Sequence, residues 1–227
     1  MTQKEKLYKN LPRPKLTRAQ IAEIYRRLSL ERPAPETELN YVNPYTLVVA
    51  VALSAQATDI GVNKATKALF VAADTPEKML ALGEDTVRDY IKTIGLYRNK
   101  AKNVIKLSQL LVDEYDSIVP QTREDLMRLP GVGRKTANVV LNEAFGHPTM
   151  AVDTHIFRVA NRTGMAPGKD PLEVELNLLR VTPDAYLQGG HHWILLHGRY
   201  ICKARTPECY ACPVQDICRF RPKTPPP

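Results

Sequence analysis

Long apolar segments are absent from this sequence of 227 residues. No apolar run approaches the roughly 20 residues that a membrane-spanning helix needs, which excludes a helical membrane protein. Residues 1–8 are polar and lack the apolar core of a secretory signal, which predicts a cytosolic protein. Convincing strand patterns and internal repeats are also lacking. Cysteine is missing from the chain before position 202, which excludes a disulfide framework spread along its length.

The composition is that of a folded, basic protein. Apolar residues make up 44% of the chain, which is typical of a globular protein, and the length allows one large domain or two small ones. The formal net charge of +8 favours a polyanionic partner over the alternative of a merely solvated charged surface. A basic segment at 1–16 and a Pro-rich tail at 222–227 are expected to be flexible.

Helical signals dominate the chain and predict an all-α fold of roughly ten helices. Thr17 to Gln20 resembles a capping box that starts the first of them. The run 45–55 is apolar on every side and suits a buried helix, because Asn43 and Pro44 form a helix start. Its β-branched residues leave a buried strand open. The first helix is expected at 18–31, and the others at 59–70, from 75 onward, 84–94, 98–115, 122–129, 134–144, 154–163, 171–180 and 182–200.

The stretch 129–136 predicts a hairpin between two helices. Pro130 ends the first helix, and Gly131 and Gly133 permit a backbone turn that other residues disfavour. The glycine N–H groups and the N-terminus of the second helix form an anion site suited to a phosphate, with Lys135 at the start of that helix. The motif alone leaves an ordinary tight turn between packed helices open.

The four cysteines lie within 17 residues near the end of the chain, at Cys202, Cys209, Cys212 and Cys218. Four thiolates suit a tetrahedral zinc ion or a 4Fe–4S cluster. Structural zinc sites usually use two close pairs, whereas here one close pair is flanked by two single cysteines. This spacing favours the cluster over zinc, and over four unligated thiols. Either metal would be structural, because four protein ligands leave no open coordination position. The loop between the first two cysteines carries Lys203 and Arg205, which either contact phosphates or only add solubilising charge.

Five stretches, in order, resemble the endonuclease III family of DNA repair glycosylases, within the helix-hairpin-helix superfamily. They are Leu-Ser-Ala-Gln-Ala-Thr-Asp at 53–59, Ile-Lys-Thr-Ile-Gly-Leu-Tyr at 91–97, Leu-Pro-Gly-Val-Gly-Arg-Lys-Thr-Ala-Asn-Val-Val at 129–140, Ala-Val-Asp-Thr-His-Ile-Phe-Arg-Val at 151–159, and the cysteine spacing. The resemblance covers residues 17–220 and implies two all-α lobes with DNA in a cleft between them. One is a six-helix barrel at 37–147 that contains the hairpin. The other is a 4Fe–4S lobe formed by 1–36 and 148–227.

Lys135 and Asp153 are the predicted catalytic pair. Releasing a base and then cutting the strand needs a nucleophile that forms an imine with the sugar C1′, which an amine does and water does not. Asp153 can deprotonate or orient the amine and offset the positive charge that grows on the sugar. The resemblance gives this pair the same roles; the alternatives are a phosphate-binding lysine and a plain helix N-cap. His155 is a candidate for a supporting role, and equally an ordinary polar residue on a helix.

A base inside a duplex must be flipped out before an enzyme can reach it, and side chains then fill the gap. Gln56 and Leu96 match the family's gap-filling residues, and Asp59 matches a position near its base pocket. From the residues alone, the first two could be turn residues and Asp59 a helix cap. The hairpin would bind a phosphate beside the lesion without reading sequence. The expected DNA contacts are Gln56, Asp59, Leu96, Pro130, Gly131, Val132, Gly133, Arg134, His155, Lys203 and Arg205.

These residues predict a bifunctional glycosylase and β-lyase. We expect it to act as a monomer on oxidised pyrimidines and abasic sites in duplex DNA, at the nucleoid in a bacterial cytoplasm. The adenine-specific mismatch glycosylases resemble it in fold and cluster. They lack the lysine, however, and carry a glutamate on the helix that spans 44–58 here, where no carboxylate occurs before Asp59. A non-catalytic helix-hairpin-helix DNA-binding module would need the hairpin and the charge, but neither the catalytic pair nor the gap-filling residues.

Overall fold

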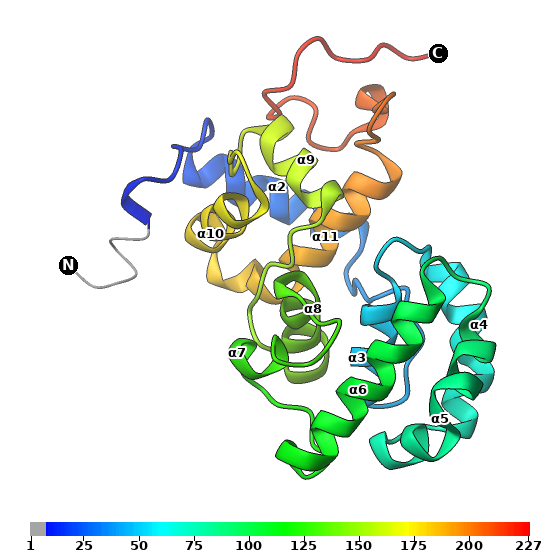
Figure 1. The fold of residues 1–227 in the computed structure, drawn as a ribbon. Helices are drawn as coiled ribbons and strands as arrows, with labels where there is room; N and C mark the ends of the chain where they lie inside the picture. Colours follow the sequence, from blue (N-terminus) through cyan, green and yellow to red (C-terminus); the bar gives the residue numbers. More distant parts are fainter. Residues whose placement is uncertain (1–7) are drawn as a thin grey trace. The chain divides into compact units, whose positions relative to one another are not determined.

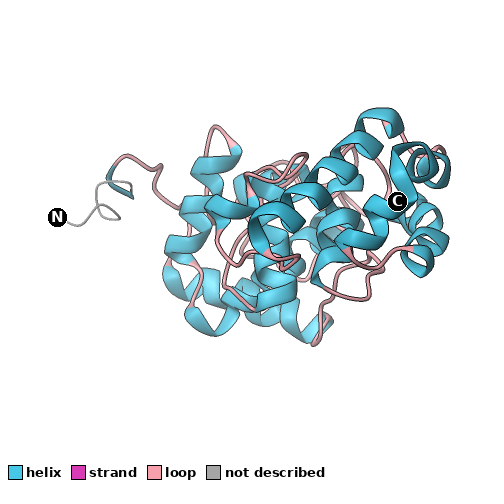
Figure 2. Cartoon of the chain, turned by 60° about the horizontal axis from the view of Figure 1, so that its bottom comes forward, coloured by secondary structure: helices cyan, strands magenta, loops and turns pink. Residues whose placement is uncertain are grey.

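The computed structural model describes residues 8–227, and these form helices joined by loops, without a strand (Figure 2). The prediction of an all-α chain is confirmed. The chain divides into two compact units: unit 1 is Met1–Glu36 together with Pro148–Pro227, and unit 2 is Thr37–His147. Across the described residues, each helix is too short or too polar to cross a lipid bilayer.

Unit 2 contains α3 (Pro44–Leu53), α4 (Asp59–Ala72), α5 (Pro76–Ile91), α6 (Tyr97–Tyr115), α7 (Arg123–Leu126) and α8 (Arg134–Phe145) (Figure 1). The central helix is α3, in which every residue from Tyr45 to Leu53 is buried and which packs against α4, α6 and α8. Asn43 caps it, because its Oδ1 accepts a hydrogen bond from the Thr46 N–H at 2.9 Å. The buried helix is therefore confirmed, and the strand that the β-branched residues left open does not form.

The helix α5 consists of two helical segments that meet at Gly83, where φ is +76°. Only glycine takes this conformation without strain, so the chain changes direction there. The two helices expected from about 75 and from 84 are these two segments. They pack along α6, and both α5 and α6 supply fully buried apolar side chains to the core of unit 2, including Met79, Val87, Leu107 and Leu111.

Unit 1 contains α2 (Arg18–Glu31), α9 (Thr154–Thr163), α10 (Pro171–Val181) and α11 (Leu187–Tyr200), with 3₁₀ turns at Asp184–Tyr186 (η1) and Cys209–Ala211 (η2) (Figure 1). The helix α11 packs against α2 and α9. Two aromatic side chains in the core of unit 1 have hydrogen-bond partners for their polar groups. The buried Tyr25 hydroxyl shares a hydrogen bond of 2.8 Å with Thr182 Oγ1, and Trp193 Nε1 donates to the Arg32 carbonyl at 2.8 Å.

The expected single helix at 182–200 is wrong at its start. The helix α10 continues to Val181, Thr182 is extended with ψ of 126°, and α11 begins only at Leu187, after η1. Pro183 explains the interruption, because the residue before a proline is pushed out of the helical region.

The described part of the segment before α2 is hydrogen-bonded to other residues of unit 1. Of the expected flexible arm at 1–16, the first seven residues lie outside the described part of the chain. Beyond them, Arg180 Nη2 donates to the Pro12 carbonyl at 3.1 Å, and the Lys15 N–H donates to the Gly164 carbonyl at 2.8 Å. These bonds tie the segment to α10 and to the end of α9.

Candidate functional site

The predicted hairpin joins α7 to α8 in unit 2. Gly131 has φ of +84°, in the left-handed region that favours glycine. Gly133 is the N-cap of α8 and contributes no side-chain cap, so the first N–H groups of the helix have no side-chain acceptor at that position. Both glycines are exposed. An anion at this end of α8 would therefore meet backbone donors and the positive end of the helix dipole.

Buried contacts fix the hairpin in place. Val132 is only 6% exposed, and a Cβ on Gly131 would lie 3.2 Å from the Cβ of Asn103, so the hairpin backbone rests directly on α6. Behind the hairpin, Arg123 Nε on α7 donates at 2.8 Å to Oδ1 of Asn138, which is fully buried on α8. The hairpin is thus held by three helices of unit 2.

Lys135 is the second residue of α8, and its side chain is exposed, while the preceding Arg134 is half-buried. The described residues give the Lys135 amine no hydrogen-bond or ion-pair partner. Because α8 starts directly after Gly133, an anion held by the hairpin N–H groups would lie within one helical turn of the Lys135 backbone. The amine is therefore available to a group bound beside the hairpin.

Gln56 and Leu96 both have left-handed backbone conformations, with φ of 55° and 59°. Such conformations are strained for residues other than glycine and concentrate at functional sites. Both side chains are exposed, Leu96 by 57%. A Cβ on Gly95 would lie 3.7 Å from the carbonyl oxygen of Gln56, so the two turns are neighbours. Unit 2 therefore presents these two side chains from adjoining strained turns.

Asp59 is the first residue of α4 and is half-buried. The N-cap of this helix is Thr58, whose hydroxyl accepts a hydrogen bond from the Gly61 N–H at 3.1 Å. The alternative that Asp59 serves as the helix cap is therefore wrong.

Asp153 is the N-cap of α9 in unit 1, as the sequence predicted. Its Oδ1 accepts hydrogen bonds from the backbone N–H groups of His155 and Ile156, at 2.9 and 2.8 Å. Within the described chain no hydrogen bond reaches Oδ2, so one oxygen orients the carboxylate and the other stays available. The half-buried His155 directs Nδ1 toward Arg158 Nη2, 3.1 Å away.

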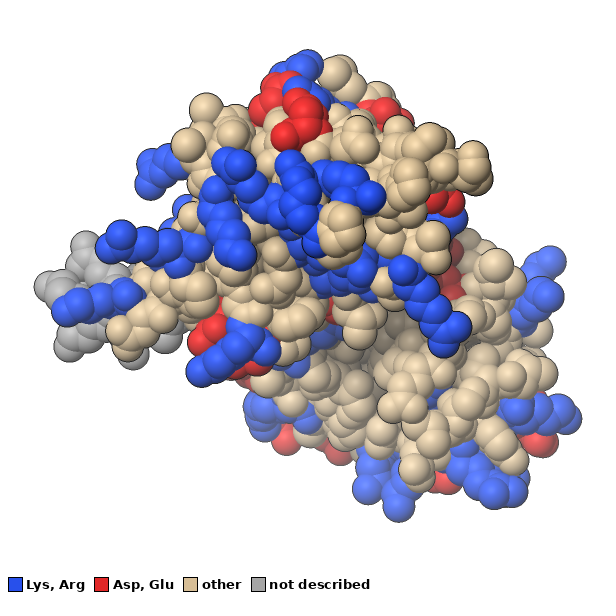
Figure 3. Space-filling model, turned by 90° about the horizontal axis from the view of Figure 1, so that it is seen from above, with Lys and Arg blue, Asp and Glu red and all other residues tan. Residues whose placement is uncertain are grey.

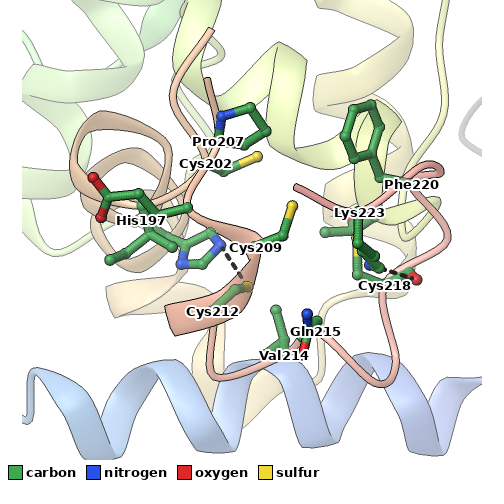
Figure 4. Close-up of a pocket in the computed structure, with 13 residues that line it drawn as sticks. His197, Cys202, Pro207, Cys209, Cys212, Val214, Gln215, Cys218, Phe220 and Lys223 are labelled. Atoms are coloured by element: carbon green, nitrogen blue, oxygen red, sulfur yellow. Dashed lines mark hydrogen bonds between the residues drawn. The ribbon is translucent and has the colours of Figure 1, made fainter. Parts of the chain in front are cut away.

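The four cysteines line one cavity in unit 1 (Figure 4). The cavity holds about 340 Å³ of empty space, part of it open to solvent. His197 of α11 lies beside it, with Nε2 3.7 Å from Cys212 Sγ. Burial raises the pKa of the Cys212 thiol to about 11 and lowers the pKa of His197 to about 4. Both groups are thus neutral at pH 7 in the protein alone, and a bound cation is what would turn the thiol into a thiolate.

The four cysteines together offer four sulfur ligands to a metal centre. All four thiols are unbridged. Among the described residues, no three Cys, His, Asp or Glu side chains stand close enough together to hold one metal ion. Zinc needs its sulfur ligands within about 2.3 Å of one point, whereas the thiolates of a 4Fe–4S cluster bind separate irons and stand further apart. The four cysteines line one cavity and supply the number of thiolates that such a cluster takes.

Two arginines of α9 hold the segment that carries the first cysteine. Arg158 Nε donates to the Cys202 carbonyl at 2.9 Å. Arg162 donates to the carbonyls of residues 203–204, each at 2.7 Å, and its Nη1 lies 3.6 Å from Cys202 Sγ. One helix therefore carries Asp153 at its start and binds the cysteine segment along its length.

The two basic residues predicted in this segment differ in their surroundings. Lys203 forms an ion pair with Glu208, whereas Arg205 is exposed and the described residues provide it with no partner. Only Arg205 can therefore bind an anion without breaking an ion pair. More widely, lysine and arginine side chains gather across the face seen in Figure 3, with few acidic groups among them. A surface of this kind attracts a polyanion.

The predicted site residues are divided between the units: the hairpin, Lys135 and the two strained turns belong to unit 2, and Asp153 and the cysteines to unit 1. Sequence analysis missed Arg158, Arg162 and His197. The spacing of four between the two arginines places them on one helix face and could have revealed them. No local signal marks His197, which the packing of α11 brings to the cysteines.

Comparison with known proteins gives consistent matches. The profile of the HhH-GPD superfamily of base excision DNA repair proteins matches residues 49–184. Endonuclease III of Rickettsia felis is 56% identical over 200 residues, which are 88% of this chain and 94% of that protein. Endonuclease III of Escherichia coli is 54% identical over 208 residues, which are 92% and 99% of the two chains.

Solved structures of DNA repair glycosylases are similar to this chain as well. A trapped endonuclease III–DNA covalent intermediate superposes with a TM-score of 0.84 at 46% identity, covering 90% of this chain and 96% of the other. A thermostable thymine-DNA glycosylase shares the fold, with a TM-score of 0.76 at 22% identity over 96% of both chains.

Proposed function

This chain belongs to the endonuclease III family, within the HhH-GPD superfamily of base excision DNA repair proteins, and from this membership we propose that it uses Lys135 and Asp153 to excise oxidised pyrimidines from duplex DNA. It is a bifunctional DNA glycosylase and AP lyase. The observation that carries the proposed roles is an exposed, unpartnered amine on the first turn of α8, directly after an exposed two-glycine hairpin.

Lys135 is the proposed nucleophile. Its neutral amine attacks the sugar C1′, the base departs with the electrons of the glycosidic bond, and the product rearranges to an imine between Nζ and the opened sugar. The imine draws electrons from the sugar, so that a proton leaves C2′ and the 3′ phosphate is eliminated. The described residues place no acidic partner on the Lys135 amine, so no ion pair has to break before it attacks.

Asp153 is the proposed carboxylate of the reaction. Two backbone N–H groups fix its Oδ1, at 2.9 and 2.8 Å, which leaves Oδ2 to accept a proton from the amine or to face the positive charge on the sugar. Because these bonds belong to the start of α9, the orientation of the carboxylate is set before substrate arrives.

Unit 2 supplies most of the proposed DNA contacts, and His155 and Arg205 of unit 1 supply the others. The N–H groups of Gly131 and Gly133 bind one backbone phosphate, and Gln56 and Leu96 enter the duplex where the damaged nucleotide has left it. Their adjoining left-handed turns hold both side chains outward, which supports this role. Asp59, His155 and Arg205 are proposed to contact the DNA or the extruded nucleotide.

We further propose that Cys202, Cys209, Cys212 and Cys218 hold one 4Fe–4S cluster around the cavity they line. When bound, the cluster supplies thiolate–iron bonds that crosslink the chain, and with four protein ligands it takes no part in the sugar chemistry. Arg162 and His197 stand beside the ligand sulfurs and shield them. A brown protein with a visible absorption band supports the cluster, whereas a colourless protein containing zinc contradicts it.

Borohydride trapping tests the proposed function. Wild-type protein is mixed with a labelled duplex that contains thymine glycol or an abasic site, and sodium borohydride reduces any imine to a stable adduct. We expect an adduct with the wild type and none with Lys135→Ala, which should still bind the duplex. Lys106→Ala, an exposed substitution on α6, is the matched control and should trap normally.

Each outcome of this experiment decides a claim. An adduct with Lys135→Ala would show that another amine is the nucleophile. A wild-type protein that binds the duplex but gives no adduct with either substrate would instead indicate a non-catalytic DNA-binding module.

We propose that the active form is a monomer that works at the nucleoid. Sedimentation with and without duplex DNA measures whether the protein is a monomer.

A further inference from the structure

Lys100 is a buried cation in unit 2 that the proposed reaction does not use. It lies in the first turn of α6, its side chain is only 7% exposed, and its Nζ finds no hydrogen-bond partner among the described residues. Burying an unpaired ammonium is unfavourable, because the protein interior replaces neither its hydration nor its counter-ion. Burial accordingly lowers the pKa of Lys100. A buried charge of this kind is expected where an anion arrives from outside.

Lys100 lines a cavity that opens beside the hairpin. The cavity holds about 520 Å³ of empty space, part of it open to solvent, between the end of α3, the start of α6 and Gly131. Ala52 and Leu53 form an apolar wall, whereas Asn99 and Asn103 supply amide groups. Leu96, one of the proposed gap-filling residues, stands at the same cavity. The cavity therefore adjoins two of the parts of unit 2 that are proposed to touch DNA.

The cavity is electropositive. Its lining contains one charged residue, Lys100, and no carboxylate. The N-cap of α6 is Leu96, which offers no side-chain hydrogen bond to the helix, and no acidic residue occurs in the first turn. The described cap and first turn of α6 therefore offer no acceptor or acidic side chain of their own to the positive end of the helix dipole, and this dipole adds to the charge of the ammonium.

We propose that this cavity is a second phosphate site, in which Lys100 and the first turn of α6 bind a backbone phosphate of the DNA next to the one held by the hairpin. Asn103 connects the two sites, since it lines the cavity and lies against Gly131. The long, flexible lysine stem lets the ammonium turn from its buried position to the phosphate. The proposal rests on the proposed function in one respect, that the chain binds duplex DNA.

A phosphate suits the cavity better than a nucleobase does. A base needs a matched set of acceptors and donors, and an ammonium that faces a neutral ring remains without a counter-charge. A phosphate supplies that charge and also accepts hydrogen bonds from backbone N–H groups and from the amides of Asn99 and Asn103. Binding of this kind positions the duplex without reading its sequence.

The salt dependence of DNA binding tests the proposal. Binding of a duplex that contains a tetrahydrofuran abasic analogue, which cannot form an imine, is measured at several salt concentrations. Lys100→Met removes the charge and keeps the length of the side chain. We expect the slope of log K against log salt to become shallower by about 0.9, the value for one phosphate contact. Lys102→Met, an exposed substitution on the opposite face of α6, should keep the wild-type slope.

The thermal stability of the same variants shows whether the buried Lys100 charge destabilises the free protein. Without DNA, Lys100→Met should melt at a higher temperature than the wild type, because it removes an unpaired buried charge. An unchanged slope for Lys100→Met overturns the proposal, and so do equal decreases in both variants, which would report only the loss of net charge. Should Lys100→Met fail to fold, Lys100→Gln provides the same comparison. A wild-type protein that binds no duplex refutes the proposed function itself.

Discussion

Replacing Leu96 by glycine should separate the stability of this protein from its activity. Leu96 is the N-cap of α6, with φ of 59° and ψ of 23°, and its side chain is 57% exposed. A leucine in this conformation strains the backbone, whereas glycine adopts it freely. The strain is retained, on our proposal, because the side chain is needed outside the folded core, in the DNA.

The change in the free energy of unfolding of Leu96→Gly follows from three contributions. Left-handed backbone costs an L-residue about 1–2 kcal/mol, which glycine does not incur. Glycine loses about 0.5–1 kcal/mol more backbone entropy on folding. At 57% exposure, the buried part of the leucine side chain contributes on the order of 1 kcal/mol. These contributions nearly cancel, so Leu96→Gly should unfold within about 1 kcal/mol of the wild type. Leu96→Ala keeps the strain and should be about 1 kcal/mol less stable than Leu96→Gly.

Urea denaturation of the two variants measures this order, with the same pair at Leu172 as control. Leu172 is 46% exposed, but it lies within the first turn of α10, where glycine should be less stable than alanine by about 0.5–1 kcal/mol. An alanine variant at Leu96 as stable as the glycine variant would refute the argument from strain. Release of an oxidised pyrimidine from duplex DNA should fall in both Leu96 variants alike, and unimpaired release would remove Leu96 from the gap-filling role.

Two further predictions concern the hairpin and the core of unit 1. Gly131→Ala introduces a Cβ at φ of +84°, 3.2 Å from Asn103, so it should destabilise the protein by about 1–2 kcal/mol. It should also weaken the binding of undamaged and damaged duplexes alike, which equilibrium titration measures. Burial lowers the pKa of His192 from 6.5 to about 4. The neutral, buried imidazole therefore contributes its full stabilisation above pH 6.5. This stabilisation, at most about 3 kcal/mol, is lost as the pH falls toward 4. Urea unfolding at pH 7 and pH 5 should show this loss, and His192→Asn should reduce it.

Helix starts could be predicted because their determinants are local. Thr17 and Gln20 form the predicted capping box, with hydrogen bonds of 3.2 and 3.0 Å, and α2 starts directly after Thr17. Asp153 caps α9, and Gly164 ends it in a left-handed conformation. The apolar pattern continues across Pro183 and therefore predicts a helix from 182, whereas the proline pushes Thr182 out of the helical region.

The chemistry-bearing residues of the site could be listed from the sequence, but not their surroundings. Gln56 occurs in Ser-Ala-Gln-Ala, where no glycine marks the left-handed turn that it adopts. Lys100 and Lys102 stand two residues apart on one helix, and the packing of other parts of unit 2 against α6 buries the first and leaves the second exposed. Burial of a charge and strain in a turn depend on contacts distant in sequence, which a local pattern does not contain.

The division of the chain has a consequence for its synthesis. Unit 2 is one continuous segment, so it can fold as soon as α8 has left the ribosome. Unit 1 is assembled from both ends of the chain, and α2, made first, packs against α11, made near the end. The apolar face of α2, with Ile21, Ile24 and Leu28, therefore lacks this partner during most of translation. Nascent chains released before α11 expose this face, and they are the species that chaperones and proteases should engage first.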